Sequence, residues 1–300
     1  MQIKKLMFPV LFIGVFAACQ KDDNSIQSVA NPDHSKFEPV AAGIAPSPLA
    51  YTQKVLVEMY STVSCATCPD SEQKFKNYAA AKPDRVYGAN IHTGDAMSNP
   101  QFTFLNGLFN ITQYSSGSFN RLPYIGSAVI HKTKWASSNI INTSLNKTAK
   151  CGLKINSTIS GNTLNTTVTA GFGQTMVGNY NITVYLIENG VSGTGAGYNQ
   201  SNYYNTIAGS QWYQLGNPII GYVHDNVLRK VATPAIGTPI TAISMIPGGS
   251  FTKSFTIDVT GYNQANLYLI AFINKVGTNG VTHEIMNVQQ VKAGQNKGWN

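Results

Sequence analysis

Charged residues are scarce in this sequence, and those present are not clustered. Asp, Glu, Lys and Arg make up 11% of the 300 residues, with a formal net charge of +8. The lysines and arginines form no run of five and no basic amphipathic helix, which argues against a nucleic-acid partner. After residue 18, no stretch approaches the roughly 20 consecutive apolar residues of a transmembrane helix. The abundance of Asn, Thr, Ser, Gly and Tyr is common in exported bacterial proteins and in β-rich domains.

Sequence signatures of several enzyme classes are also missing. The chain contains no serine-nucleophile motif, no phosphate-binding loop and no dinucleotide fingerprint. It has four cysteines, but no second CxxC and no HxxxH that would complete a zinc site with Cys65 and Cys68. We therefore expect no metal and no cofactor.

The amino terminus has the features of an export signal. Lys4 and Lys5 precede an apolar segment at 6–16 that is too short to span a bilayer, so residues 1–18 are predicted to be a cleaved signal. The small residues directly before Cys19 resemble a lipoprotein signal, in which this cysteine becomes the acylated amino terminus. An ordinary secretory signal followed by a chance cysteine is the alternative.

Lipid chains on Cys19 would anchor the protein in a bilayer without spanning it. The acidic pair in QKDDN, just after the cysteine, resembles the signal with which Bacteroidetes-type bacteria send lipoproteins to the outer face of the outer membrane. Residues 19–49 carry several prolines and no helical or alternating period, which predicts a flexible tether. We therefore expect an outer membrane protein that faces outward, with the periplasmic face as the alternative.

Two kinds of pattern follow the tether, and they predict two domains. In residues 50–149 short apolar runs alternate with helical segments, which predicts an α/β domain with a partly parallel sheet. Its strands are expected at 55–60, 86–92 and 124–131, and its helices at 65–81, 99–109 and 136–147. In residues 150–300 about seven segments alternate apolar and polar residues, which predicts an antiparallel, immunoglobulin-like β-sandwich. The expected fold class is thus an α/β domain followed by an all-β domain.

A long insertion at 189–221 interrupts the strands of the second half. It places Tyr203, Tyr204, Trp212 and Tyr213 among Gly, Ser and Asn. Rigid aromatic rings with small polar spacers are typical of recognition loops, so these four are candidate ligand-binding residues. The alternative is that the rings fold back and cover the edge of the sandwich.

The sequence VLVEMYSTVSCATCPD at 55–70 places two cysteines after a buried strand and at the start of a helix. There, unpaired backbone N–H groups and the helix dipole stabilise a thiolate on Cys65. A lowered thiol pKa makes Cys65 a nucleophile, and Cys68, one turn on, is placed to resolve a mixed disulfide. The pair is a candidate thiol–disulfide oxidoreductase site that acts on a protein thiol or disulfide.

A strand, a CxxC at a helix start and a proline before a later strand together resemble the thioredoxin fold. The resemblance implies that Pro123, in NRLPYIGSAVI, is the cis-proline that packs against the active-site disulfide and contacts substrate. The wider chain resembles the outer membrane protein 28 family of Bacteroidetes lipoproteins, which join a thioredoxin-like domain to a β-sandwich. The segments that carry this resemblance are VLVEMYSTVSCATCP, IHTGD at 91–95, HDNVLR at 224–229 and EIMNVQQVK.

The cysteine segment departs from the thioredoxin pattern at several positions. Ser64 replaces the Trp before the first cysteine, Ala66 and Thr67 replace Gly-Pro, and Met59 stands where thioredoxins have a buried Asp. Glu58 is adjacent, but strand alternation turns it to the other side of the sheet. Three interpretations of the cysteine pair stay open: thiol–disulfide exchange, a structural disulfide in a binding or adhesion lipoprotein, and a metal site, for which too few ligands are in evidence.

The remaining polar and sulfur-containing candidates are interpreted as structural. His92 follows a strand and is expected on a loop surface, and Cys151, at the domain junction, is expected to be a buried small hydrophobe. His224 and Asp225 are neighbours on a predicted strand, so their side chains point to opposite faces and do not form a catalytic pair. Arg229 is likewise expected to be structural.

Overall fold

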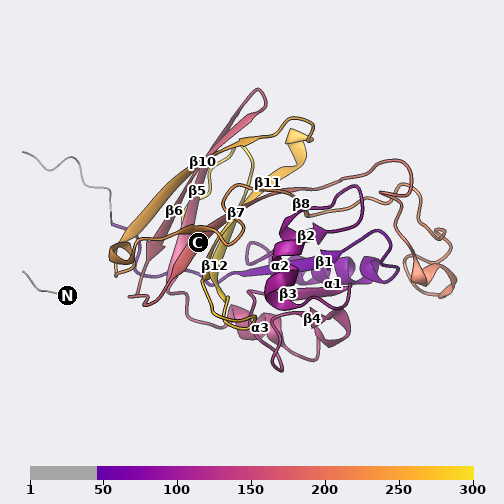
Figure 1. Cartoon of the computed structure of the whole chain (residues 1–300), viewed down its shortest axis with the longest axis horizontal. Helices are drawn as coiled ribbons and strands as arrows, with labels where there is room; N and C mark the ends of the chain where they lie inside the picture. Colours follow the sequence, from indigo (N-terminus) through magenta and orange to yellow (C-terminus); the bar gives the residue numbers. More distant parts are fainter. Residues whose placement is uncertain (1–45) are drawn as a thin grey trace, which may run out of the picture. The chain divides into compact units, whose positions relative to one another are not determined.

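The computed structural model of the chain describes residues 46–300 (Figure 1). The expected signal at 1–18, the expected lipid acceptor Cys19 and the expected tether as far as residue 45 lie outside the described residues. The last tether residues belong to the folded part, because Ser47 is buried and its N–H and hydroxyl donate to the carbonyls of Gly248 and Gly249. Among the described residues, no helix is long and apolar enough to cross a membrane.

Most of the regular structure in residues 46–300 is β-strand, with three α-helices. The strands and α-helices in chain order are β1 (Val55–Ser61), α1 (Cys68–Ala81), β2 (Val86–His92), α2 (Gln101–Phe109), β3 (Ser116–Phe119), β4 (Ile130–His131), α3 (Ile140–Leu145), β5 (Cys151–Ser160), β6 (Thr163–Phe172), β7 (Tyr180–Glu188), β8 (Val227–Val231), β9 (Thr238–Pro239), β10 (Ser250–Asp258), β11 (Leu267–Lys275) and β12 (Ile285–Lys292). Short 3₁₀ turns connect some of them, including one at Tyr203–Thr206 in the insertion.

The first four strands lie side by side in the order β2-β1-β3-β4. β1 and β2 run parallel along their whole lengths, from the pair Val55–Val86 to the pair Ser61–His92. β3 is antiparallel to β1, and β4 is antiparallel to β3. The partly parallel sheet predicted from the alternation of strands and helices is therefore present. β1 and β2 end at the same edge of the sheet. This edge therefore carries both the loop after β1, residues 62–67 (the cysteine loop), and His92 at the end of β2.

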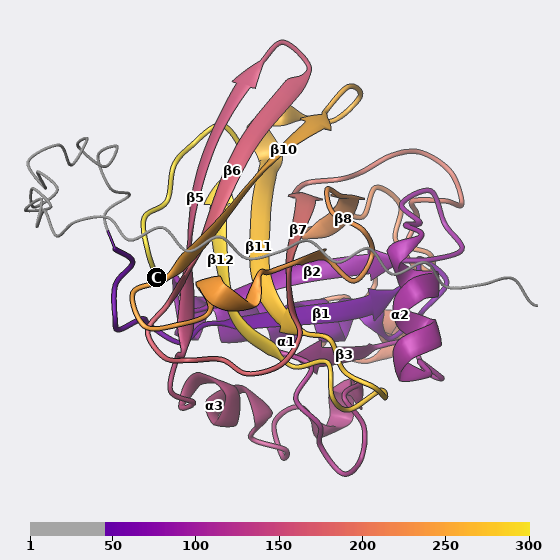
Figure 2. The same cartoon turned by 60° about the vertical axis from the view of Figure 1, so that its left-hand side comes forward.

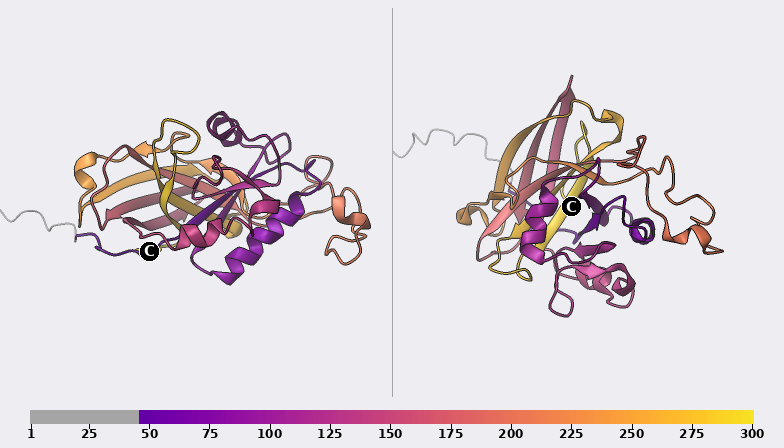
Figure 3. Two further views of the ribbon diagram at one scale, coloured as in Figure 1. Left: turned by 90° about the horizontal axis from the view of Figure 1, so that it is seen from below. Right: turned by 45° about the vertical axis from the view of Figure 1, so that its right-hand side comes forward.

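Helices cover both faces of these strands (Figures 1 and 3). α1 and α3 pack on one face, in a core that includes Phe75 and Met59. α2 packs on the other face, in a core that includes Leu56 and Phe102. α1 approaches β2 closely because Gly88 has no side chain: a Cβ there would lie 2.3 Å from the Phe75 ring. The face of α1 that carries the second cysteine is fixed by this contact.

The second half of the chain extends the same sheet. β8 is antiparallel to β7 and parallel to β2, so the full order is β12-β11-β7-β8-β2-β1-β3-β4, with β9 beside β7. A shared core lies at the junction, where Tyr60 and Ile91 of the first half pack in one cluster with Tyr185 and Phe272 of the second. The described residues accordingly belong to one compact unit.

β5, β6 and β10 form a second, antiparallel sheet of three strands (Figure 2). It packs against the β7, β11 and β12 part of the large sheet, in a core that includes Leu153, Val168, Val184 and Leu269. The alternating pattern of the sequence predicts these strands and their two-layered packing. It also predicts a separate immunoglobulin-like domain from residue 150. In the structure, one layer of the sandwich is instead continuous with the first half, because β8 pairs with both β2 and β7.

The sequence does not predict β3, and it places a strand where the chain turns. The segment SGSF is poor in strand-forming residues, yet all four residues are buried between β1 and β4. Gly117 is required there, because a Cβ would lie 3.0 Å from the Glu58 carbonyl oxygen and from the Trp135 ring. The strand predicted at 124–131 is limited to its last two residues, since Tyr124 and Ser127 exchange the hydrogen bonds of a tight turn.

A buried ion pair lies in the shared core. The carboxylate of Glu58 on β1 accepts two hydrogen bonds of 2.7 Å from Arg121, and the two side chains are 0% and 2% exposed. The hydroxyl of Tyr185 on β7 donates to the same carboxylate at 3.0 Å. The Arg121 guanidinium also lies over the rings of Phe109 and Phe272. The pair therefore ties β1 to β7 and β11 with the bidentate geometry that gives the strongest hydrogen bonds.

Replacement of Arg121 by Met is expected to lower the free energy of unfolding by about 3–5 kcal/mol, because it leaves the Glu58 carboxylate buried without a cation. Urea denaturation of the two proteins measures this difference. The matched control is Lys134→Met, which removes an exposed cation and should change the stability by no more than about 0.5 kcal/mol. A loss below about 1 kcal/mol in Arg121→Met would contradict the role assigned to the pair.

Candidate functional site

Cys65 and Cys68 form a disulfide at the edge of the sheet where β1 ends. Their Cα atoms are 5.4 Å apart. α1 begins at Cys68, so Cys65 lies in the turn before the helix rather than in its first turn as the sequence predicts. Pro69, which lacks an N–H, fits this start because it lies in the first turn of the helix, where backbone N–H groups have no partner within the helix. Cys65 is 9% exposed and Cys68 is 0% exposed, so the first sulfur is the more accessible of the two.

Ser115, the residue before β3, contacts both sulfurs. Its hydroxyl lies 3.2 Å from Cys65 Sγ and 3.5 Å from Cys68 Sγ. The same hydroxyl is 2.7 Å from the hydroxyl of Thr67, which lies between the cysteines. Ser115 is completely buried and has a φ of 60°, in the left-handed region. A hydroxyl group, and not a proline, therefore packs on the disulfide from the side of β3.

The structure places Pro123 elsewhere, which corrects the expectation that it packs against the disulfide. β3 is antiparallel to β1, so its first residue pairs with Tyr60, near the cysteines, and its last pairs with Val57, toward the far end of β1. Pro123 follows that far end and is exposed. Its peptide bond is trans, since the cis peptide bond found among the described residues is Asn217–Pro218 in the insertion.

The side chains of β1 next to the cysteines confirm the predicted alternation. Met59 faces α1 and packs in the cluster of Phe75. Glu58 faces the opposite side, where Arg121 and Tyr185 hold its carboxylate. The carboxylate of β1 therefore lies on the face away from α1. At the position where thioredoxins have a proton acceptor for the second cysteine, this chain has the thioether of Met59.

The insertion lies against the cysteine loop and not over the sandwich edge (Figure 1). The N–H of Ser201 donates to the carbonyl of Val63 at 2.8 Å, and the N–H of Tyr203 donates to the carbonyl of Ala66 at 2.9 Å. The side-chain amide of Gln200, which is fully buried, donates to the carbonyl of Cys65 at 2.9 Å. These bonds satisfy three backbone carbonyl groups of the loop. The alternative that the aromatic residues cover the sandwich is therefore wrong.

Lys132, which follows β4, connects the cysteine loop to the insertion. Its amino group donates to the carbonyl of Thr67 at 3.0 Å, to Asp70 at 2.7 Å and to the hydroxyl of Tyr204. Burial raises the pKa of Asp70, but the hydrogen bonds from Lys132 and Lys74 outweigh it and hold that pKa below its usual value. Burial and the nearby Asp70 raise the pKa of Tyr204 to about 12, so its phenol stays protonated at neutral pH.

Three of the four aromatic candidates contact one another beside the cysteine loop, and the fourth, Tyr213, lies next to Trp212 in the sequence. The Tyr204 ring contacts the rings of Tyr203 and Trp212 at centroid distances of 5.4 and 5.1 Å. Tyr203 and Tyr213 are 60% and 40% exposed, whereas Tyr204 and Trp212 are half-buried beneath them. The structure thus places exposed aromatic surface on the segment that is hydrogen-bonded to the residue after Cys65.

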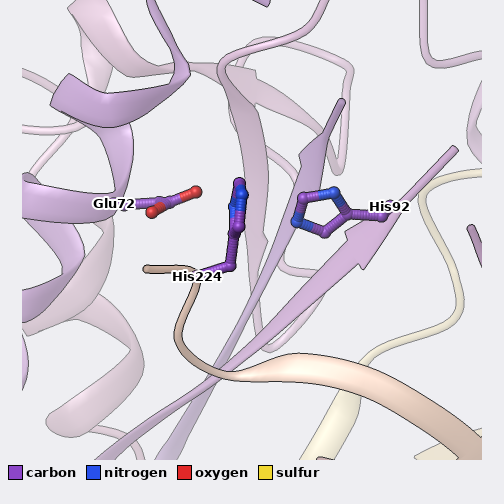
Figure 4. A group of neighbouring side chains, drawn as sticks. All are labelled: Glu72, His92 and His224. Carbon is purple, nitrogen blue, oxygen red and sulfur yellow. The ribbon is translucent and has the colours of Figure 1, made fainter. Parts of the chain in front are cut away.

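A second polar cluster lies along α1, one turn beyond Cys68 (Figure 4). It joins Glu72 from α1, His92 from the end of β2 and His224 from the segment before β8. All three are buried, and their ligand-capable atoms lie within 4.8 Å of one another. Burial raises the pKa of the Glu72 carboxyl. Burial lowers the pKa of His224 to about 4, so this imidazole is neutral at neutral pH.

The sequence does not predict this cluster, and its pattern favours a loop surface for His92. In the structure the His92 ring is 0% exposed, which corrects that expectation. A signal was available, since His92 ends a mostly apolar strand and Asp95 follows shortly after it, at the edge where β1 delivers the cysteines. His224 was expected to be unable to pair with Asp225, and this is confirmed: Asp225 bonds to Lys76 and to the backbone of Gly190. Cys151 is a free, fully buried cysteine in the sandwich core, as predicted.

Comparisons with known proteins identify similar chains. A family model described as outer membrane protein Omp28 matches residues 104–297. Among solved structures, HBP35 of Porphyromonas gingivalis is 17% identical, with a TM-score of 0.66, over 81% of this chain and 76% of that chain, which shows a shared fold. Protein AGR_C_4864 from Agrobacterium tumefaciens is 9% identical, with a TM-score of 0.47, over 80% of this chain and 94% of that chain, and this likeness carries no argument. No curated protein matches the chain.

Replacement of Lys132 by Met is expected to lower the free energy of unfolding by about 1.5–3 kcal/mol, because three acceptors lose a charged donor. The matched control is Lys74→Met, which removes the other lysine bound to Asp70 but is 40% exposed, and it should cost less than about 1 kcal/mol. Urea denaturation measures both differences. Limited proteolysis should also cleave the insertion faster in Lys132→Met alone. Equal effects of the two substitutions would contradict the connecting role of Lys132.

Lys132→Met and the unmodified chain should also differ in how much stability they lose in acid. The pKa of Asp70 is lowered in the folded chain, so its ionised form stabilises the fold fully above the ordinary carboxyl pKa of 3.8. This contribution is lost as the pH falls through the lowered pKa. Lys132→Met removes one cause of the lowering, so its stability should fall less than that of the unmodified chain between pH 7 and about pH 3. Urea denaturation at these two pH values measures the loss. An equal loss of free energy of unfolding in both proteins would contradict the role of Lys132 in lowering the pKa of Asp70.

Proposed function

The chain belongs to the outer membrane protein Omp28 family, and from this premise we propose that it is a lipid-anchored protein that carries out thiol–disulfide exchange through Cys65 and Cys68. The family match bears out the resemblance indicated by the sequence motifs and points to the outer membrane. Acylation of Cys19, an outward orientation and the exchange reaction are the proposed additions.

The observation that carries the proposal is the position of the disulfide in the sheet. The strand order β2-β1-β3-β4, with β1 parallel to β2 and antiparallel to β3, places the pair between the central strand and the first helix. α1 follows β1, α2 follows β2 and α3 follows β4. This is the arrangement expected of a thioredoxin-like unit. It supports reading residues 50–149 as such a unit, built into a larger sheet.

The exchange reaction follows from the unequal accessibility of the two sulfurs. In the reduced pair, the thiolate of Cys65 attacks one sulfur of a substrate disulfide, forms a mixed disulfide and releases the other substrate sulfur as a thiolate. Cys68 then loses its proton and attacks Cys65 Sγ, which re-forms the internal disulfide and releases the second substrate thiol. The substrate gains two electrons, the pair loses two, and an external dithiol returns the pair to the reduced state. The start of α1 and the Ser115 hydroxyl stabilise the Cys65 thiolate.

The insertion supplies the surface that would recognise a protein substrate. Tyr203 is exposed and hydrogen-bonded to the residue after Cys65, and Tyr213 is the second exposed ring. Aromatic side chains give large contact area at low conformational cost. A protein chain docked on these rings would present its disulfide to the more accessible sulfur.

A second candidate function is binding without catalysis, with the disulfide as a structural element. The observation that favours it is Met59, since the adjacent Glu58 is held on the opposite face by Arg121. Without a proton acceptor, the Cys68 thiol is slow to lose its proton and to become the nucleophilic thiolate. In that case the exposed aromatic residues bind a surface ligand whether the disulfide is present or not.

Exchange activity is tested by insulin reduction with dithiothreitol as the electron donor. The chain should accelerate precipitation of the insulin B chain, and Cys65→Ser should abolish the acceleration because the attacking sulfur is lost. Cys68→Ser should trap the mixed disulfide, visible on a non-reducing gel. The matched control is Cys151→Ser at the free cysteine, which should retain full activity. No acceleration by the unmodified chain, with the disulfide and the fold intact, would favour the binding function.

The role of the insertion is tested in the same assay with Tyr203→Ala. Loss of an exposed recognition ring should lower the rate with insulin about 5–10-fold, equivalent to roughly 1–1.4 kcal/mol of binding. The rate with a small aromatic disulfide should stay unchanged, because such a substrate needs no docking surface. Equal loss with both substrates would show that the ring supports the fold of the loop and not substrate recognition.

Lipid anchoring is tested by Cys19→Ala in the native host. Acyl chains hold the protein in the membrane fraction, so the substitution should move it to the aqueous fraction on detergent phase separation. Surface proteolysis of intact cells with the unmodified chain then reports the orientation. Recovery of Cys19→Ala in the membrane fraction would contradict the anchor.

A further inference from the structure

The geometry points to a binding site for one divalent transition metal ion, represented by Zn²⁺, at Glu72, His92 and His224. We propose this site in addition to the exchange function, and it does not depend on the state of the disulfide. Two imidazoles and a carboxylate are the donor set of zinc sites that keep a fourth position open, and the same donors also hold Fe²⁺.

The three side chains converge from three different elements. The ligand-capable atoms lie within 4.8 Å of one another. In Figure 4 the ring of His224 stands between the Glu72 carboxylate and the His92 ring. The two rings meet edge to face, with centroids 5.4 Å apart. Tetrahedral zinc with bonds of about 2.0–2.1 Å requires donor atoms about 3.3 Å apart, so side-chain rotations of about an ångström would complete the site.

Each imidazole has one nitrogen engaged and one nitrogen left without a partner. His92 Nδ1 lies 2.8 Å from Asp95, and His92 Nε2 is buried with no hydrogen-bond partner. His224 Nε2 lies 2.9 Å from the carbonyl oxygen of Tyr198, and His224 Nδ1 is buried with no partner. A carboxylate or carbonyl beyond the ring fixes the tautomer and leaves the other nitrogen as a free lone pair. Two buried lone pairs beside one carboxylate are unfavourable unless something binds them.

The negative charge of the cluster would also be stabilised by a bound cation. Glu72 and the fully covered side chain of Asp95 contribute carboxylates, and the two rings carry no charge when each has one proton. The nearest lysine on α1, Lys76, is paired with Asp225 at 2.7 Å. Buried negative charge without a neighbouring cation is costly. A divalent ion would offset it without disturbing the hydrogen bonds of Glu72 to Asn90 and Tyr222, because each carboxylate oxygen accepts more than one bond.

Tyr222 marks the side from which an ion would reach the site. Its hydroxyl bonds to Glu72 at 2.9 Å, and its ring lies 4.8 Å from the ring of His224. The residue is half-buried, between exposed Gly221 and Val223 at the end of the insertion. Because Tyr222 contacts two of the three side chains and is itself half-buried, we infer that an ion enters when this side chain rotates away. Three protein ligands leave a fourth position for water or a small oxygen-containing ligand.

Zinc binding to the mature chain, purified with an affinity tag that contains no histidine, tests the site. Metal analysis after dialysis against Zn²⁺ should give one equivalent per chain. Competition with a chromophoric chelator should show that Glu72→Gln and His224→Ala bind at least 100-fold more weakly, and that Asp95→Asn binds about 10–100-fold more weakly because it orients His92. The matched control is His131→Ala, which removes a histidine ring that hydrogen-bonds only to Thr133 among the described residues and should bind zinc like the unmodified chain.

Two further measurements keep the test decisive if a variant folds poorly. Zn²⁺ should raise the melting temperature of the unmodified chain, and a chelator should reverse the rise, because the ion binds the folded state. X-ray absorption should show nitrogen and oxygen neighbours without sulfur, and the double variant Cys65→Ser, Cys68→Ser should still bind. Absence of stoichiometric zinc in the unmodified chain, or sulfur in the coordination shell, would overturn the proposal whatever the outcome of the insulin assay.

Discussion

The buried pair of Glu58 and Arg121 is the interaction on which the arrangement of the molecule depends. It sits where the first-half strands meet β7 and β11, and Tyr185 hydrogen-bonds to it from the second half. A charged pair in such a place is stable only with its geometry complete, so it fixes how β1 lies against β7. With β1 and β2 fixed, their carboxyl ends place the cysteine loop and His92 at one edge of the sheet.

The insertion between β7 and β8 then connects the two polar sites of that edge. Its residues Gln200, Ser201 and Tyr203 bond to the cysteine loop, and its far end leads into Tyr222 and His224. The carbonyl of Tyr198, also in the insertion, holds the His224 ring. One long segment without α-helix or β-strand therefore determines both how the disulfide is reached and how the buried histidine is oriented, which is typical of loops that carry function on a rigid sheet.

The sequence was informative where a local pattern and the tertiary packing agree. The apolar runs at β1 and β2, the alternation of β5 to β7 and β10 to β12, and the helix after the cysteines all follow from periodicity. Predictions from the sequence were wrong where tertiary packing overrides the local preference for strand or turn. SGSF becomes β3 because Trp135 and the β1 backbone leave room for glycine only, and Ser115 thereby takes the place expected for Pro123. The resemblance segments IHTGD and HDNVLR contain two of the three clustered ligands, although neither segment shows this alone.

By itself, the sequence determined most of the strands and helices, the cysteine pair as the candidate site, the alternation that turns Glu58 away from the cysteines, and the family. These are properties of neighbouring residues, set by side-chain period and by short spacings. Tertiary structure alone decided that one sheet spans both halves, that the insertion lies on the cysteine loop and not on the sandwich, and that Glu72, His92 and His224 meet. Those contacts join residues 20 to 150 positions apart, and no local period records which distant side chains a buried edge will bring together.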